Sequence, residues 1–437
     1  MKKIVAMLIA CMLIVSACAF AETEITVWTP AINAAGYMQD IAAMTERFEA
    51  ANEGINVEIV ELNWDGIGEK LETAMMTDST PDVYIDGTAR TAKLPSTGLT
   101  VDVSDVLAGL DGWNEGAVAI GEVDGGHYLV PMTLMPSTIL TINTSLAKEY
   151  GVYDMLPEDH MSWDWTEFIA FLEACGEKSL ADGVYPIGIF AGSQSSDIAY
   201  YTMLLSAGAA ILNEDHSAAA VNSSEAVQAM AYLKEIVDKG LAYPGVAEIT
   251  DDNAQGVFLA GKTVVDLSIN GGLNAIPLLE AMVADGLLSE VPEVEGYAWP
   301  TLNGSATNIG NWGANCIAIF ENEGDEEKIA AAKAYISFMM NDKEYLESLW
   351  ADAASYGPAR DMGLELKLDN ERMLKEAEIN ATFAAYNNSA FGVLESYWGE
   401  IRQYFYPELQ SMLLGNKTPE EAIAAFEKGI TEVLNFN

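Results

Sequence analysis

Tryptophans flanked by amides and carboxylates are the residues of this chain whose types and spacing could bind a ligand. The clearest group is Asn63-Trp64-Asp65, in which an aromatic ring stands between an amide and a carboxylate. A sugar offers flat C–H faces to an aromatic ring and a rim of hydroxyls to polar side chains. This group therefore predicts carbohydrate binding, although a tryptophan packed under its own loop would give the same sequence.

Further candidate contacts share this aromatic or polar character and lie in predicted loops or near the ends of elements. They are Trp28, Asp86, Gln194, Asn270, Gly271, Asn311, Trp312, Tyr356 and Trp398. Several have an equally simple structural interpretation. Trp28 could close the edge of a sheet, Asp86 could lie in a solvated turn, and Trp398 belongs to a helical aromatic stripe, which usually packs in a core.

The sequence offers little for catalysis or metal binding. It contains no G-x-S-x-G nucleophile elbow and no H-E-x-x-H zinc motif. A glycosidase needs two carboxylates at a defined separation, but with 66 acidic residues such pairs arise by chance. His127, His160 and His216 lie in polar turns. We expect a binding protein without metal or cofactor, and a secreted glycoside hydrolase is the alternative.

The composition indicates a folded but strongly acidic protein. The 437 residues carry a net charge of −45, and half of them are hydrophobic. This charge repels nucleic acid and anionic membrane surfaces and disfavours a phosphorylated ligand. The apolar content is sufficient for two domains with full cores. Cys175 and Cys316 are expected to be two buried thiols rather than a disulfide.

The first 21 residues predict a signal peptide for export. A basic start precedes an apolar run over residues 4–15, which is too short to cross the roughly 30 Å hydrocarbon core. Ala19-Phe20-Ala21 predicts cleavage before Glu22, whereas Val15-Ser16-Ala17-Cys18 resembles a lipobox in which Cys18 would be lipidated. Both sites remain open, so the protein is expected in a periplasm or anchored at a cell surface.

The elements that must position the candidate residues alternate between strand and helix. In the N-terminal third, residues 25–28, 55–62 and 82–85 predict strands, and residues 35–51 and 66–77 predict helices. This order predicts a parallel sheet with helices on both faces. Ligands of such sheets bind beyond the carboxyl ends of the strands, where the loops that follow Trp28, Leu62 and Ile85 would lie.

The remaining chain predicts a second α/β unit without a flexible linker. The expected helices cover residues 163–175, 197–208, 222–239, 326–340 and 419–434. Residues 187–190 and 316–320 predict strands, and residues 257–269 predict a helix end, a turn and a strand. Ser162, Asn222 and Thr418 are the expected N-caps of three of these helices.

The chain contains a series of short segments in an order that is typical of one family. The segments are Ile25-Thr26-Val27-Trp28, Pro81-Asp82-Val83-Tyr84, Gly98-Leu99-Thr100-Val101-Asp102, Tyr128-Leu129-Val130-Pro131, Thr141-Ile142-Asn143, Trp165-Thr166-Glu167-Phe168, Phe258-Leu259-Ala260-Gly261-Lys262-Thr263-Val264-Val265, Gly357-Pro358-Ala359-Arg360 and Thr418-Pro419-Glu420-Glu421-Ala422-Ile423. Behind an export signal, this series resembles the extracellular solute-binding proteins of bacterial ABC importers, in the group that includes the maltose-binding protein.

The resemblance implies a two-lobed, periplasmic-binding-protein-like α/β fold that closes about a hinge on a ligand in the interlobe cleft. Residues 22–134 and 314–350 would form the first lobe, and residues 135–313 and 351–437 the second. It further implies a monomer that delivers a neutral sugar or oligosaccharide to a membrane permease; a polyamine or peptide is the alternative solute. The family often has a tryptophan after Asn270-Gly271-Gly272, where this chain has Leu273, so one stacking platform would be missing.

Overall fold

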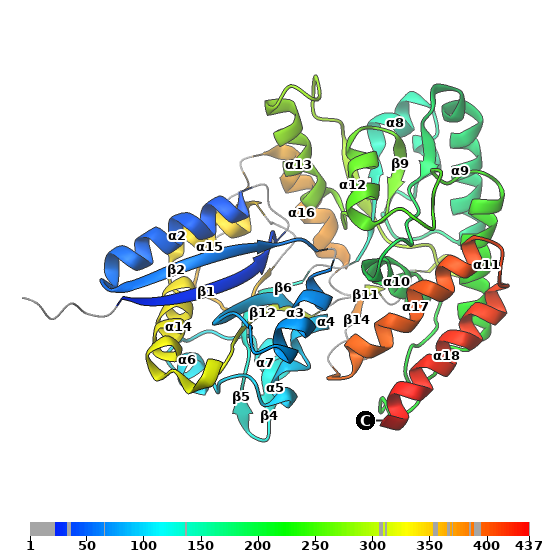
Figure 1. Cartoon of the computed structure of the whole chain (residues 1–437). Helices are drawn as coiled ribbons and strands as arrows, with labels where there is room; N and C mark the ends of the chain where they lie inside the picture. The colour runs from blue at the N-terminus through cyan, green and yellow to red at the C-terminus, as the bar shows by residue number, and fades with distance from the viewer. Residues whose placement is uncertain are drawn as a thin grey trace, which may run out of the picture.

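The computed structural model describes residues 22–32, 36–64, 66–135, 138–305, 309–310, 313–352, 357–364, 368, 370–383, 386–388 and 395–436. Two sheets, each covered by helices, form two lobes (Figure 1). The predicted signal segment with Cys18 lies outside the described residues, as do the candidate contacts Asp65, Asn311, Trp312 and Tyr356.

The first lobe contains a six-stranded sheet in the order β13-β6-β12-β3-β1-β2. Its strands are β1 (Thr23–Pro30), β2 (Ile55–Leu62), β3 (Val83–Gly87), β6 (Val130–Leu134), β12 (Ala314–Ile319) and β13 (Gly357–Pro358). β1 runs parallel to β2 and β3, which confirms the predicted parallel core. β12 returns from a distant part of the chain and pairs antiparallel with β3 and β6.

Helices cover both faces of this sheet because successive strand residues point to opposite sides. On β3, Ile85 faces one apolar core and Tyr84 faces the other. The helices around this sheet are α2 (Tyr37–Ala51), α3 (Ile67–Met76), α4 (Thr88–Thr91), α5 (Leu94–Thr97), α6 (Ser104–Ala108), α7 (Glu115–Val118), α14 (Glu326–Met339) and α15 (Lys343–Asp352). α2, α14 and α15 share the core that contains Ile85, whereas α3 packs over Tyr84.

The second lobe contains a four-stranded sheet in the order β10-β7-β9-β8. Its strands are β7 (Leu140–Asn143), β8 (Tyr185–Ile187), β9 (Thr263–Asp266) and β10 (Val294–Tyr297). The strand predicted over residues 187–190 overlaps β8 only at Ile187. The difference arises because the chain leaves the sheet after Gly188, and both backbone groups of Phe190 then bond to the Tyr200 hydroxyl.

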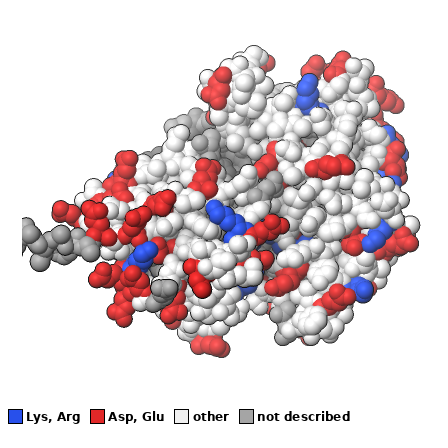
Figure 2. Space-filling model, viewed as in Figure 1, with Lys and Arg blue, Asp and Glu red and all other residues white. Residues whose placement is uncertain are grey.

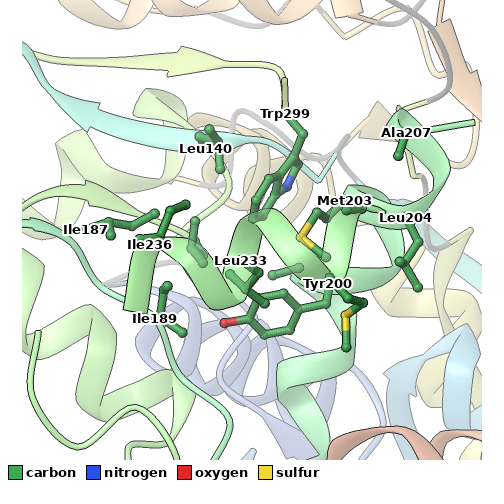
Figure 3. Packing of buried hydrophobic residues seen from close by; sticks show 14 of the residues in the cluster. Leu140, Ile187, Ile189, Tyr200, Met203, Leu204, Ala207, Leu233, Ile236 and Trp299 are labelled. Atoms are coloured by element: carbon green, nitrogen blue, oxygen red, sulfur yellow. The ribbon is translucent and has the colours of Figure 1, made fainter. Parts of the chain in front are cut away.

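A large apolar core joins most helices of the second lobe (Figure 3). The helices that share it are α8 (Thr144–Glu149), α9 (Trp165–Ser179), α10 (Asp197–Ser206), α11 (Ser224–Asp238), α12 (Asp251–Leu259), α17 (Trp398–Leu413) and α18 (Pro419–Phe436). The helices α13 (Gly272–Ala284) and α16 (Glu371–Phe383) pack together in a smaller separate core. Tyr200 on α10, Leu233 on α11 and Trp299 are buried together in this core. Residues of the C-terminal helices α17 and α18 belong to the same core, so these helices are part of this lobe.

The N-caps of two helices differ from those predicted, and one agrees. Asp164 rather than Ser162 caps α9, and its side chain and that of Glu167 form a reciprocal capping box. Ser223 rather than Asn222 caps α11. In both cases the capping residue has the extended backbone that an N-cap requires. Thr418 caps α18 as predicted, and it and Glu421 each accept a hydrogen bond from the other's backbone N–H.

Replacing Asp164 with alanine is expected to lower the free energy of unfolding by about 1 kcal/mol, because a backbone N–H at the start of α9 loses its acceptor. Ser162→Ala serves as the comparison, since Ser162 Oγ bonds to Asp159 and not to the helix. Urea denaturation of both variants measures the effect. A larger loss in the Ser162 variant would contradict the observed cap.

Residues 357–364 pack on the first lobe, whereas the sequence-based division assigned them to the second. β13 pairs with β6 at the edge of the six-stranded sheet. Arg360 Nε donates to the Asp111 carbonyl over 2.9 Å. Met362 and Leu364 contact the apolar core of the first lobe. Residues 357–364 therefore belong to the first lobe.

Both internal cysteines are buried and neither forms a disulfide, which confirms the expectation of two thiols. Cys175 lies on α9 and Cys316 on β12, in different lobes. Within the described ranges, no helix has both the length and the apolar character needed to cross a bilayer. Acidic side chains are spread over the visible face of the molecule, and most densely over the first lobe (Figure 2).

Candidate functional site

A pocket of about 340 Å³ lies where the two lobes meet. The first lobe contributes α3, α4 and Lys93, and the second contributes α17 and the short helix η4 (Gln194–Ser196). The lining residues are Gly68, Glu69, Leu71, Glu72, Ala89, Arg90, Lys93, Gln194, Gly399, Arg402, Gln403 and Tyr406. The lobes contact each other here: a methyl group built on Gly399 would lie 4.0 Å from the Ala89 carbonyl oxygen.

The wall from the first lobe is built on a buried ion pair between Asp86 and Arg90. Arg90 Nε and Nη2 donate to the two carboxylate oxygens of Asp86 over 2.5 and 2.7 Å. The Gly87 N–H and the Tyr84 hydroxyl also donate to this carboxylate. Burial opposes the charge of Arg90, but Asp86 outweighs this effect and raises the pKa of the guanidinium.

The prediction that Asp86 contacts a ligand is therefore corrected. Its side chain is fully buried, and its oxygens already accept bonds from Arg90, Tyr84 and Gly87. Asp86 holds Arg90 in position, and Arg90 forms the surface of the pocket. The sequence contained a signal for this pair, because an acid followed four residues later by a base is typical of an ion pair along one turn of chain.

The wall from the second lobe repeats this arrangement with Asp197 and Arg402. Arg402 on α17 donates from Nε and Nη2 to the carboxylate of Asp197 on α10, over 2.6 and 2.8 Å. Both side chains are at most 1% exposed. Burial raises the pKa of Asp197, and the charges of Arg402 and of Arg90 partly offset that rise. Arg90 therefore acts electrostatically on a carboxylate of the opposite lobe.

Trp64 lies beside this wall, at the carboxyl end of β2. Its indole Nε1 donates to the Ala31 carbonyl over 3.0 Å, and the ring remains half-buried. The Arg90 guanidinium lies 5.4 Å from the ring centre. The neighbouring Asn63 is exposed. Of the predicted contacts, Trp64 and Asp86 both lie against Arg90, and Gln194 of the other lobe lines the same pocket as Arg90.

Trp28 and Trp398 lie away from the interlobe pocket. Trp28 is within β1, half-buried beneath α3, with Lys70 Nζ 4.4 Å from its ring centre. It lines a separate open pocket beside that helix. Trp398 is fully buried in the second core, 5.3 Å from the Tyr201 ring. The prediction that Trp398 contacts a ligand is corrected, because the aromatic stripe of α17 faces the core.

Asn270 and Gly271 precede α13 in an unusual backbone conformation. Both residues have positive φ, 63° and 95°. The φ of Gly271 is a backbone conformation that other residues rarely adopt, which favours glycine here, and a methyl group would in addition lie 2.8 Å from Ile139 Cδ1. The side-chain oxygen of Asn270 is buried and accepts no hydrogen bond within the described part of the chain. These residues do not line the interlobe pocket described above.

The sequence-based search did not identify the pocket residues of α17. Gly399, Arg402 and Tyr406 recur at spacings of three and four, which places them on one helix face. The aromatic stripe on the same helix, with Trp398 and Phe405, faces the core instead. The signal available in the sequence was the helical spacing of these pocket residues beside the helical spacing of the aromatic residues.

One segment matches the letters of a nucleotide-binding P-loop but not its structure. Gly256 to Thr263 fits G-x-x-x-x-G-K-T. A P-loop follows a strand and opens a helix. Here the segment begins inside α12 and ends at Thr263, the first residue of β9, so the order is reversed and the segment does not open a helix.

Comparison with protein families gives a match over most of the chain. The family model for bacterial extracellular solute-binding proteins matches residues 43–365. A protein of Brucella abortus (strain 2308) is 22% identical over 408 residues, which is 92% of this chain and 90% of that protein.

Solved structures share the fold over nearly the whole chain. A solute-binding protein of an ABC transporter from Thermotoga lettingae, bound with α-D-tagatose, aligns with a TM-score of 0.77 and 17% identity, covering 94% of this chain and 100% of that one. A substrate-binding protein from Listeria monocytogenes, in complex with cycloalternan, aligns with a TM-score of 0.74 and 20% identity, covering 95% and 100%. At this identity the likeness establishes the two-lobed fold.

Proposed function

This chain belongs to the bacterial extracellular solute-binding proteins, and on that premise we propose that it captures a sugar or oligosaccharide between its lobes for an ABC importer. The observation that carries the proposal is the interlobe pocket, to which both lobes contribute polar side chains. The bound sugars in two proteins of the same fold support this ligand class.

The pocket provides the groups that a hydroxylated ligand needs. Gln194 and Gln403 offer both donors and acceptors, and Arg90 offers N–H donors at a fixed position. Tyr406 in the pocket and Trp64 at its edge offer aromatic surface to the C–H face of a sugar ring. Residues from both lobes would contact one ligand, so binding would stabilise the closed arrangement.

A ligand panel tests the proposed function. Maltotriose, laminaribiose and diacetylchitobiose are titrated while tryptophan fluorescence and melting temperature are followed. A ligand present at 100 times its Kd raises the free energy of unfolding by about 2.7 kcal/mol, so binding shifts the melting temperature measurably. The sugars should be recovered intact, since cleavage would favour a glycoside hydrolase. A shift with spermidine or a peptide, and none with a sugar, would show that the ligand class is wrong.

Replacing Trp64 with phenylalanine is expected to abolish the fluorescence change on sugar binding and to weaken binding about tenfold, or about 1.4 kcal/mol. Trp113→Phe is a matched control. Trp113 likewise bonds a backbone carbonyl, Leu107, over 3.0 Å and lies 5.2 Å from an arginine, Arg360. Unlike Arg90, which lies beside Trp64 and lines the pocket, Arg360 is not among the lining residues. Equal losses in both variants would contradict a ligand contact at Trp64.

We further propose that the protein is exported, as its family is extracellular. β1 begins at Thr23, so a lipid on Cys18 would be joined to the first lobe by a tether of at most about 17 Å. Mass spectrometry of the mature N-terminus distinguishes a free Glu22 from an acylated Cys18.

A further inference from the structure

Every basic side chain that lines the interlobe pocket is paired with a carboxylate. Arg90 is paired with Asp86 and Arg402 with Asp197, each through two hydrogen bonds. Lys93 Nζ lies 2.9 Å from a carboxylate oxygen of Glu72. Glu69 adds a further negative charge to the lining. The pocket therefore contains cations but no uncompensated positive charge among the described residues.

In the two arginine pairs, the carboxylate neutralises the charge of the guanidinium and also fixes its orientation. In each pair Nε and Nη2 point at the carboxylate, which fixes the plane of the guanidinium. A fixed guanidinium presents N–H donors to a neutral hydroxyl without reorganisation. A ligand carboxylate would instead meet a cation that is already neutralised and would lie near Glu69.

We propose that Asp86, Asp197 and Glu72 determine the charge specificity of this pocket, so that it accepts uncharged sugars and excludes sugar acids. This inference rests on the proposed function, because it assumes that a sugar occupies the pocket. The carboxylates act as positioning residues: each one holds a cation of the wall and cancels its charge.

The burial of each of the three carboxylates predicts how strongly its charge affects ligand selectivity. Asp86 and Asp197 are fully buried, where charge interactions are weakly screened. Glu72 is 44% exposed, where solvent and salt screen its interaction with Lys93. Loss of charge at Asp86 should therefore change ligand selectivity more than loss of charge at Glu72.

The test compares digalacturonate, as the acidic probe, with maltotriose, laminaribiose and diacetylchitobiose. The wild type is expected to bind a neutral probe and to bind digalacturonate at least ~30-fold more weakly. Asp86→Asn should increase digalacturonate affinity by at least ~10-fold, and this gain should decline as salt is added. Glu72→Gln should give a gain of about threefold, and because Glu72 is half-exposed this variant keeps the test decisive if Asp86→Asn does not fold.

Two further variants separate local from global charge effects. Asp105→Asn removes the same charge from a pair with Lys333 (2.8 Å) outside the pocket, and should give no gain. Asp86→Asn combined with Arg90→Gln restores neutrality and should abolish the gain.

Three results would overturn the inference: wild-type protein that binds digalacturonate as tightly as the neutral probes, a gain in Asp105→Asn equal to that in the pocket variants, or no gain in either pocket variant. Failure of the proposed function looks different. The wild type would then bind no sugar probe, while a salt-sensitive gain in Asp86→Asn would still support the assignment of charge specificity.

Discussion

Replacement of Arg402 with methionine is expected to lower the free energy of unfolding by about 3–5 kcal/mol. The cause is the carboxylate of Asp197, which would remain buried without its charged partner. Asp197 is fully buried, and its two oxygens accept hydrogen bonds from Arg402 Nε and Nη2. Burial already raises the pKa of Asp197 despite this partner, so without the guanidinium the charged form would be strongly disfavoured.

Urea denaturation without added ligand measures this effect apart from binding. Arg372→Met is the matched control, since Arg372 lies exposed on α16 and its guanidinium donates to the Val291 carbonyl; its loss should stay within about 0.5 kcal/mol. Combining Arg402→Met with Asp197→Leu removes both charges and should recover most of the stability. A loss below about 1 kcal/mol in the single variant, or no recovery in the double one, would contradict a structural role for the pair.

The regular elements of the first lobe could be predicted from local patterns. The strand over residues 55–62 and the end of α2 at Ala51 agree with the structure, because period-two and period-3.6 apolar patterns depend on neighbours in the chain. Helix starts were less predictable. Ser162 and Asp164 are both good N-cap types, and only the backbone conformation shows which one caps α9.

The residues of the candidate site could be predicted only in part from local sequence patterns. Trp64 and Gln194 could be found because their residue types suit a sugar and strand ends converge at a sheet edge. Arg90 and Arg402 each had a local signal in the sequence, but their meeting in one pocket could not be predicted, since only the tertiary structure brings α4 and α17 together across about 300 residues of sequence. The role of the two arginines becomes clear only from the structure, in which each is paired with a buried carboxylate.

Glu376 is the buried acid with the clearest consequence for pH dependence. Its carboxylate is 2% exposed, and Oε2 accepts hydrogen bonds from the N–H groups of Gly272 (3.1 Å) and Gly296 (3.0 Å). The other oxygen, Oε1, is buried and bonds to no described residue. Burial, with the nearby charge of Glu295, raises the pKa of Glu376 to about 8, although the two N–H groups and Lys375 act in the opposite direction.

Glutamine at position 376 is therefore expected to remove a loss of stability that the wild type suffers as pH rises from 5 to 8. Below pH 4.5 the carboxyl group is protonated in both states and costs nothing. Between its unfolded pKa near 4.5 and its folded pKa of about 8, the unfolded chain releases the proton while the folded protein retains it. Stability then falls by up to about 1.4 kcal/mol per pH unit, or about 5 kcal/mol in total.

The amide of Glu376→Gln keeps an oxygen for the two N–H groups and never ionises, so the variant should gain several kcal/mol over wild type between pH 5 and pH 8. Urea denaturation across this range measures the gain, with Glu378→Gln on the exposed face of α16 expected to follow the wild-type profile. Parallel profiles for wild type and Glu376→Gln would show that this carboxyl group ionises normally in the fold.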